Sequence, residues 1–226
     1  MAITAALVKE LRERTGAGMM DCKKALVETN ADLEAAIDLM RASGAAKAAK
    51  KAGRVASEGL VNVTISDDNK QAAILEVNSE TDFVTKGSAF IDFVEALGSL
   101  ALKNKPESVE SFLSQKLDSG ETVDEAREGI IAKIGENISV RRVQIISTDT
   151  GILGAYKHGD RIAVLTVLAS QDSALAKDVA MHIAASRPEC VSENQLSDDI
   201  LEREKAIFIE QARESGKPDN IIEKMI

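Results

Sequence analysis

The chain has 226 residues, a formal net charge of −9 and a hydrophobic content of 44%, values typical of one or two folded domains with substantial cores. This acidity and an aromatic content of only 3% argue against a protein that wraps nucleic acid or stacks bases. The longest apolar runs, such as residues 162–168, are far shorter than the roughly 20 residues that cross a bilayer, so a membrane protein is not expected.

No catalytic motif is present in the sequence. The only histidines are His158 and His182, and no GxSxG, HExxH or GxxxxGK[ST] string occurs. Residues 16–21 resemble a phosphate-binding loop but lack its third glycine and a preceding strand. Cys22 and Cys190 form no CxxC pair and have no zinc-ligand spacing with the histidines, which favours a reducing cytoplasm. We therefore expect a cytoplasmic protein that is not an enzyme and needs no metal or cofactor.

The first 44 residues predict three short helices. Thr4 is placed to cap the first helix, and a glycine-containing turn at residues 15–18 leads into the second. Asn30 is placed to cap the third helix and Gly44 to end it. Their apolar stripes contain Leu7, Val8 and Leu11, then Cys22, Ala25 and Leu26, then Leu33, Ala36, Ile37 and Met40. The pattern predicts a small bundle suited to docking on a partner.

Residues 45–58 are rich in alanine and lysine. Alanine and lysine favour helix, while the near absence of large apolar side chains argues against a place in a core. The segment is either a basic contact for an acidic partner or a solvated linker helix. A charge run this short favours the linker helix.

From Gly59 onward the apolar period changes from helical to two. Alternating residues on both sides of a polar turn at residues 67–70 predict a β-hairpin. Helical periodicity follows over residues 88–102, with Phe90, Phe93, Val94 and Leu97 on one face. Residues 138–146 then form another strand-like run.

A weak internal repeat relates this region to the one that follows. Ala73, Leu75, Val77 and Asp82 correspond at a constant offset to Ala163, Leu165, Val167 and Asp172. Each copy is preceded by a strand pattern and followed by a helical one, so the two copies share the order hairpin, loop, helix. The repeat predicts two paired α+β subdomains.

The last segment returns to helical patterns. Residues 198–214 form an amphipathic helix, residues 215–218 break it, and a second apolar stripe begins at Ile221. This is typical of an antiparallel helical hairpin. The predicted division is therefore an N-terminal module at 1–44, a basic linker helix at 45–58, core subdomains at 59–147 and 148–190, and the hairpin at 191–226.

The second core subdomain lacks a partner for its predicted hairpin. No period-two pattern follows Pro188, whereas the first subdomain is expected to add the strand at 138–146. We expect a two-stranded second sheet, an incomplete helical hairpin, and an exposed apolar face on the last helix near Met225 and Ile226.

One string between strand and helix fits the hairpin pattern poorly. Residues 77–84 read VNSETDFV and place a carboxylate beside a large apolar ring. In the simplest interpretation Asp82 caps the coming helix and Phe83 packs into the core. In the alternative both side chains belong to an exposed contact loop. Residue chemistry alone favours the first interpretation.

The chain resembles the bacterial elongation factor Ts family, the nucleotide exchange factors of elongation factor Tu. Four stretches carry the resemblance: residues 7–24 (LVKELRERTGAGMMDCKK), 76–84 (EVNSETDFV), 132–142 (AKIGENISVRR) and 179–188 (VAMHIAASRP). The resemblance implies an α+β fold with an N-terminal three-helix module of the ubiquitin-associated type, two similar core subdomains with small antiparallel sheets, and a protruding helical hairpin.

The resemblance also implies a function and a set of site residues. Thr81, Asp82, Phe83 and Val84 match the stretch that disturbs the Mg²⁺ and nucleotide site of the partner GTPase. The implied docking residues are Arg12, Met19, Met20, Lys23 and His158. The implied partner is elongation factor Tu, both GDP-bound and nucleotide-free, with no direct contact to nucleic acid or membrane. A homodimer is not predicted.

Three alternatives stay open at the level of sequence. Met19 and Met20 are equally compatible with core packing. The whole chain is also compatible with an adaptor whose bundle binds a small protein, or with an RNA-binding ribosome accessory that uses residues 47–54. The adaptor leaves residues 81–84 without a role, and the RNA-binding reading conflicts with the overall acidity.

Overall fold

The computed structural model describes residues 3–225. The fold is α+β, and the chain divides into a first compact unit that ends at Ala184 and a second that begins at Ala185. Within the described residues, no helix combines the length and apolarity needed to cross a membrane.

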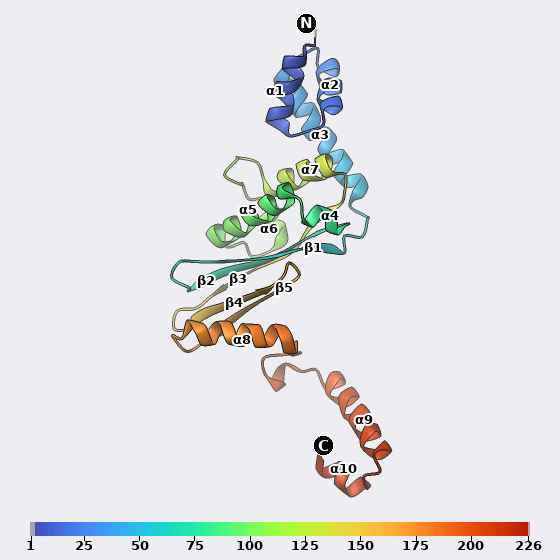
Figure 1. Cartoon of the computed structure of the whole chain (residues 1–226), viewed down its shortest axis with the longest axis vertical. Helices are drawn as coiled ribbons and strands as arrows, with labels where there is room; N and C mark the ends of the chain where they lie inside the picture. Colours follow the sequence, from blue (N-terminus) through green and yellow to red (C-terminus); the bar gives the residue numbers. More distant parts are fainter. Residues whose placement is uncertain (1–2, 226) are drawn as a thin grey trace. The chain divides into compact units, whose positions relative to one another are not determined.

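The N-terminal bundle consists of α1 (Ala5–Thr15), α2 (Met19–Glu28) and the first half of α3 (Leu33–Lys51) (Figure 1). Thr4 caps α1 as predicted, because its side chain accepts a hydrogen bond from the Leu7 N–H. Gly16 ends α1 in the left-handed conformation with φ 65°. The small core of the bundle is formed by Val8, Leu11, Cys22, Ala25, Leu26 and Ala36.

Two predictions about α3 are wrong. Asp32, not Asn30, caps the helix, because Asn30 has a left-handed φ of 53° and belongs to the preceding turn. Gly44 does not end the helix, which continues to Lys51. Gly44 is instead buried where α3 packs against α7 (Val123–Ile134), and a Cβ there would make an ordinary contact of 3.7 Å with the Cβ of Ala132. This packing outweighs the cost of about 1 kcal/mol for glycine inside a helix.

The prediction of a separate solvated linker helix at 45–58 is also wrong. Residues 45–51 are the second half of α3, and the chain reaches β1 through residues 52–57. Ala48 is only 3% exposed and belongs to the main core. An alanine face can pack against a helix without large apolar side chains, while the side chain of Lys50 stays exposed.

The first sheet is antiparallel in the order β1 (Glu58–Ile65), β2 (Gln71–Ser79), β3 (Ile138–Ser147). The predicted hairpin and the strand at 138–146 are confirmed. One face packs against α5 (Ser88–Asn104), with α4 (Asp82–Thr85), α6 (Val109–Leu113) and α7 on the same side (Figure 1). The core between sheet and helices includes Leu60, Leu75, Val77, Phe90, Phe93, Val94, Leu97 and Val140.

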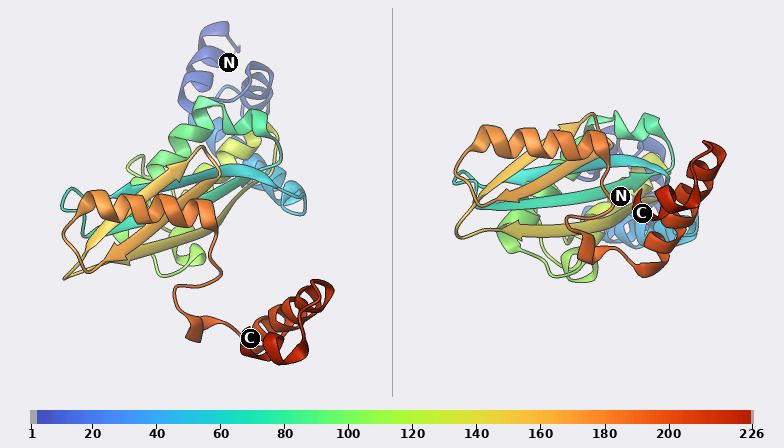
Figure 2. Two further views of the ribbon diagram at one scale, coloured as in Figure 1. Left: turned by 60° about the horizontal axis from the view of Figure 1, so that its bottom comes forward. Right: turned by 90° about the horizontal axis from the view of Figure 1, so that it is seen from below.

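The second sheet pairs β4 (Ile152–His158) with β5 (Ile162–Leu168) and lies against the other face of the first sheet. Figure 2 shows α8 (Ser173–Ser186) lying over these two strands. The approach is close because Gly154 has no side chain: a Cβ there would lie 2.3 Å from the backbone of Ala176. Thr166 donates a hydrogen bond of 3.0 Å to the Ala176 carbonyl.

The order of elements predicted from the internal repeat (hairpin, loop, helix) is confirmed, and the two copies differ in burial. Val77 is fully buried, whereas its counterpart Val167 is 47% exposed. The difference follows from position, because β2 is the central strand of three and β5 is an outer strand among the described residues.

The second unit contains a 3₁₀ turn at Glu193–Gln195, α9 (Asp198–Glu214) and α10 (Asp219–Met225). The predicted helical hairpin is confirmed, and Ala212 and Ile222 are its buried residues. Ile221 and Met225 are 45% and 46% exposed, as expected for an uncovered apolar face. The part of that prediction that concerns Ile226 falls outside the described residues. Between residues 189 and 225 the structure has no strand, so the described second sheet is two-stranded.

Candidate functional site

The ring of Phe83 is exposed on the surface of the first unit. Phe83 is 82% exposed, so the interpretation that packs it into the core is wrong. It lies on α4, a single helical turn between β2 and α5. Val84 and Thr85 on the same turn are only 7% and 9% exposed. The turn is therefore anchored on one side while it presents an aromatic ring to solvent on the other.

Asp82 is the first residue of α4 rather than its cap. Thr81 occupies the N-cap position and makes no side-chain capping bond. Asp82 forms an ion pair of 2.7 Å with Lys86 one turn later. The hydrogen bond and the positive charge of Lys86 hold the pKa of Asp82 below its ordinary value. A negative charge therefore stays beside Phe83 at neutral pH.

We expect Lys86→Ala to raise the pKa of Asp82 toward its ordinary value. A carboxyl group whose folded-state pKa is lowered adds stability above its unfolded pKa, and this stability is lost as the pH falls through the folded pKa. The stability that the Asp82 carboxylate contributes to this fold is therefore present at neutral pH and is lost as the pH falls below about 4. An NMR pH titration of the Asp82 carboxyl carbon measures the shift. Lys103→Ala removes an equal charge beside Asp118, and an equal shift of Asp82 in that variant would contradict the assignment to Lys86.

Thr81 is held by a residue that the sequence analysis did not single out. The two carboxylate oxygens of Glu136 accept the Thr81 backbone N–H at 2.9 Å and its hydroxyl at 2.7 Å. Glu136 lies in the turn between α7 and β3, 55 positions after Thr81 in the chain. It belongs to the stretch 132–142 that carried part of the family resemblance, which was the only signal for it.

The four predicted docking residues of the bundle are exposed on α1 and α2. Met19 and Met20 are 60% and 74% exposed, so the alternative of core packing for these two residues is wrong. Arg12 and Lys23 are exposed as well. Two large apolar side chains with neighbouring cations form a surface that a protein partner would cover.

His158 is exposed at the end of β4, next to a turn in which Gly159 has φ 60°. Its Nδ1 lies 3.0 Å from the Tyr156 hydroxyl. The hairpin tip is tied to the first sheet, because the Val61 N–H donates to the Asp160 carbonyl at 2.8 Å and Arg161 pairs with Glu58. His158 is thus a solvent-facing residue on a fixed tip.

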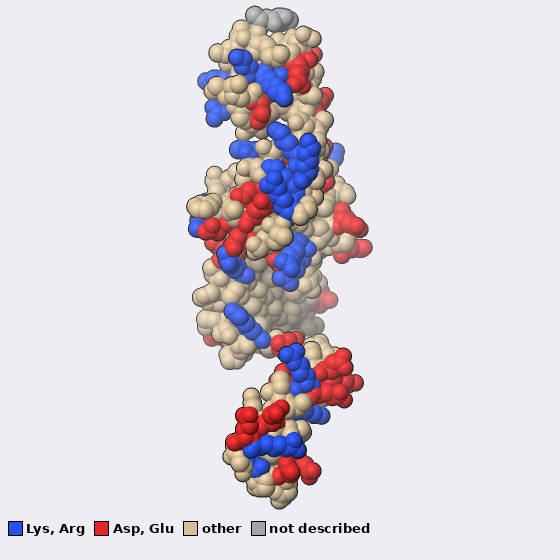
Figure 3. Space-filling model, turned by 90° about the vertical axis from the view of Figure 1, so that its right-hand side faces the viewer, with Lys and Arg blue, Asp and Glu red and all other residues tan. Residues whose placement is uncertain are grey.

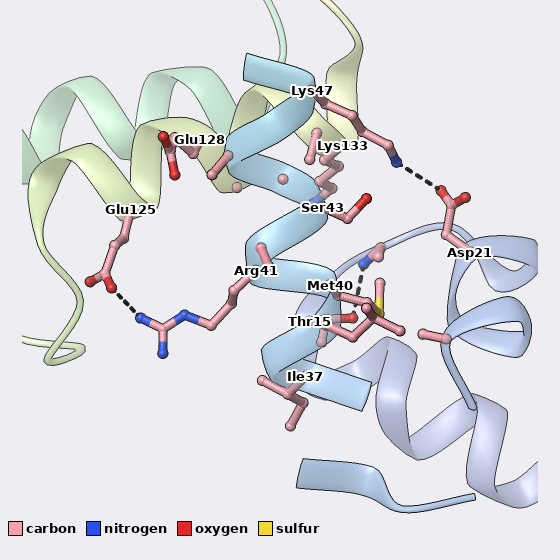
Figure 4. A pocket seen from close by; sticks show the side chains of 18 of the residues that line it. Thr15, Asp21, Ile37, Met40, Arg41, Ser43, Lys47, Glu125, Glu128 and Lys133 are labelled. Carbon is pink, nitrogen blue, oxygen red and sulfur yellow. Dashed lines mark hydrogen bonds and ion pairs between the residues drawn. The ribbon is translucent and has the colours of Figure 1, made fainter. Parts of the chain in front are cut away.

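A cleft of about 540 Å³ lies between the bundle and α7 (Figure 4). Charges of both signs line it: Arg41 pairs with Glu125 at 2.5 Å and Lys47 with Asp21 at 3.9 Å. Glu128 also lines the cleft, and its burial and the nearby negative charge of Asp124 raise its pKa. The cleft includes none of the predicted site residues, so it marks the junction of bundle and core.

Lysine and arginine side chains gather around the middle of the face of the first unit that Figure 3 shows. The C-terminal part of α3 carries Lys47, Lys50 and Lys51, and Arg54 follows shortly after it. Several of these cations are already paired: Lys51 donates to the Gly135 carbonyl, and Arg54 lies 3.5 Å from Glu80. Across residues 3–225, no three His, Cys, Asp or Glu side chains are grouped to hold a metal ion.

Comparison with known proteins gives consistent matches. The family model described as "Elongation factor TS" matches residues 80–226. The chain is similar to the elongation factor Ts of Ruthia magnifica, with 69% identity over 100% of this chain and 76% of the relative. It is also similar to the elongation factor Ts of Methylococcus capsulatus, with 53% identity over 100% of this chain and 77% of the relative. The elongation factor Ts of Legionella pneumophila is 52% identical over 99% of this chain and 76% of the relative.

Proposed function

The chain belongs to the elongation factor Ts family, and we propose on this premise that it accelerates the release of GDP from elongation factor Tu. In this proposal the protein binds elongation factor Tu in its GDP-bound and nucleotide-free forms, in the cytoplasm, and so allows GTP to bind. Membership of the family gives the role in translation elongation and nucleotide exchange, and the exposed ring of Phe83 within residues 81–84 supports the mechanism.

GDP release requires only that the nucleotide site of the partner be disturbed. A GTPase holds GDP through its phosphates and a bridging Mg²⁺, so any contact that disfavours this geometry raises the rate of nucleotide loss. The observation that carries the proposal is the 82% exposure of Phe83 on an anchored turn. The ring can insert between side chains of the partner, and Asp82 brings negative charge near the phosphates.

The exchange proceeds without a covalent step. Binding free energies couple reciprocally: if this protein weakens GDP binding, GDP weakens the binding of this protein by the same factor. The nucleotide-free partner therefore binds the factor more tightly than the GDP-bound partner does, and this difference in affinity favours GDP release. No acid, base or nucleophile is required, and none is assigned.

We further propose a division of tasks within the first unit. The bundle docks through Arg12, Met19, Met20 and Lys23, and the subdomain of residues 59–147 carries residues 81–84, which we call the exchange loop. The subdomain of residues 148–190 makes a separate contact through His158. The exposure of each of these side chains supports the division.

Release of a fluorescent GDP analogue from elongation factor Tu tests the proposed function. The partner is loaded with the analogue, an excess of GDP is added, and the release rate is followed with and without this chain. Acceleration supports exchange. Binding without acceleration would instead favour the adaptor, and salt-sensitive retention of RNA would favour the ribosome accessory.

We expect the double variant Met19→Ala, Met20→Ala to bind elongation factor Tu roughly tenfold more weakly, because two exposed apolar anchors are removed. The release rate at saturating concentrations should change much less, since these residues are assigned to docking. A titration of the release rate against protein concentration separates the two effects. Val27→Ala is the control, because Val27 is 55% exposed on the same helix. Loss of maximal rate with unchanged affinity would contradict the docking role.

A further inference from the structure

The exchange loop needs an external support. An isolated helical turn is unstable because it fixes several backbone angles for a single hydrogen bond. α4 has four residues, and its N-cap Thr81 makes no capping bond. Phe83 adds no packing because it projects into solvent. Val84 and Thr85 anchor the end of α4, so the hydrogen bonds at Thr81 fix its start and complete the orientation of the ring.

Glu136 supplies that support, together with the Ser79 hydroxyl, which donates to the Thr81 carbonyl at 3.1 Å. Its carboxylate takes both donors of Thr81, the backbone N–H at 2.9 Å and the hydroxyl at 2.7 Å. Both residues are half-buried, so water competes only partly for these bonds. Hydrogen bonds to an ionised acceptor are the strong class, and a two-point attachment also fixes orientation.

The attachment is reciprocal. The Asn137 N–H donates to Glu80 Oε1 at 2.6 Å, so residues 80–81 and 136–137 each hold the other. The Asn137 side chain is 6% exposed and donates to the Arg54 carbonyl at 2.8 Å, while Arg54 itself lies 3.5 Å from Glu80. Three segments that follow α3, β2 and α7 are thereby joined beneath α4.

The turn that carries Glu136 is itself fixed. Gly135 ends α7 with φ 88°, and its carbonyl accepts a hydrogen bond from Lys51 at the end of α3. A residue with a side chain is disfavoured at such a φ, so the sharp turn depends on glycine. The carboxylate is presented to Thr81 from a framework of two helices.

We propose that Glu136 is a positioning residue of the exchange loop, which fixes the backbone of Thr81 so that α4 starts there and Phe83 projects toward the partner. The proposal rests on the exchange function proposed above. Glu136 touches neither nucleotide nor Mg²⁺ in this scheme and acts through Thr81.

The functional test compares Glu136→Ala with Glu136→Gln. We expect Glu136→Ala to lower the maximal GDP release rate by roughly tenfold or more, because a misplaced contact group loses much of its effect. The affinity measured by titration should change less. Glu136→Gln should recover much of the rate, since its amide oxygen still accepts the Thr81 N–H. Glu107→Ala is the matched control, a lost carboxylate on the exposed surface ahead of α6.

A double-variant cycle separates positioning from general destabilisation. If Glu136 acts through the ring, Glu136→Ala should have little further effect on the release rate in a Phe83→Ala background. Additive effects of the two substitutions would overturn the proposal.

A measurement on the free protein tests the positioning role of Glu136 independently of the proposed exchange function. In the free protein, amide hydrogen exchange at Thr81 should speed up at least about tenfold in Glu136→Ala, while amides in the centre of α5 stay protected. Unchanged protection of Thr81 would overturn the positioning role even if exchange activity is found. If the wild-type chain accelerates no release but Thr81 loses protection, the exchange function fails and the attachment stands. If Glu136→Ala does not fold, the same amide measurement is made on Glu136→Gln and Thr81→Val. Each of these variants weakens the attachment in part, so faster exchange at residue 81 supports the positioning role and unchanged protection in both overturns it.

Discussion

Phe83→Ala should lower the maximal rate of GDP release by roughly ten- to a hundredfold while leaving the fold intact. Truncation of an exposed aromatic anchor typically costs about 2–4 kcal/mol of interaction, and each 1.4 kcal/mol is a factor of ten. The ring is 82% exposed, so its removal takes no packing from the core. The measurement is the release of the fluorescent GDP analogue at saturating concentrations of the variant.

Two further variants sharpen this test. Phe83→Leu keeps apolar bulk and should retain part of the rate. Val191→Ala truncates a side chain that is 95% exposed in the second unit, and it should release GDP like the wild type. A Phe83→Ala protein that is folded and fully active would show that the ring has no part in exchange.

Phe90→Ala should destabilise the first unit by about 3–5 kcal/mol, the usual range for removal of a buried aromatic ring. Phe90 is fully buried at the centre of the core between the first sheet and α5. The loss combines the transfer of apolar surface with a cavity that the rigid surroundings fill only partly. Urea denaturation measures it as a lower midpoint.

The composition provides a convenient probe for this experiment. The chain has one tyrosine and no tryptophan, and Tyr156 lies on β4 in the first unit. Its fluorescence therefore reports on that unit and not on the helical hairpin. Phe83→Ala is the matched control and should change the free energy of unfolding by less than about 0.5 kcal/mol. A Phe90→Ala midpoint equal to that of the wild type would contradict the assigned core.

Local sequence patterns determined most of the individual elements. The change of period at Gly59 located the hairpin, and the spacing of Phe90, Phe93 and Leu97 located the buried face of α5. The helix at 198–214 was predicted with the bounds that the structure has. These features depend on neighbours within one or two turns or on direct alternation, so the information lies in short stretches.

Long-range packing decided where α3 ends. Glycine at position 44 and the alanine-rich stretch after it carry local signals for a helix end and a solvated linker. Contact with α7, which lies about 80 residues further along the chain, overrides both signals, because the small residues of this part of α3, Gly44 among them, are buried against α7. No window of the sequence around Gly44 contains that information.

The candidate site divides in the same way. The sequence by itself predicted the roles of residues 81–84 and of the docking residues, through family resemblance rather than through physical pattern. Residue chemistry alone favours a core position for Phe83 and does not decide the burial of Met19 and Met20, because the same apolar side chains suit a core or an interface. Only the tertiary structure decided that they are exposed. It alone also brought Glu136 to Thr81, since a hydrogen bond between residues 55 positions apart depends on how β2 and β3 pair and leaves no periodic trace in the sequence.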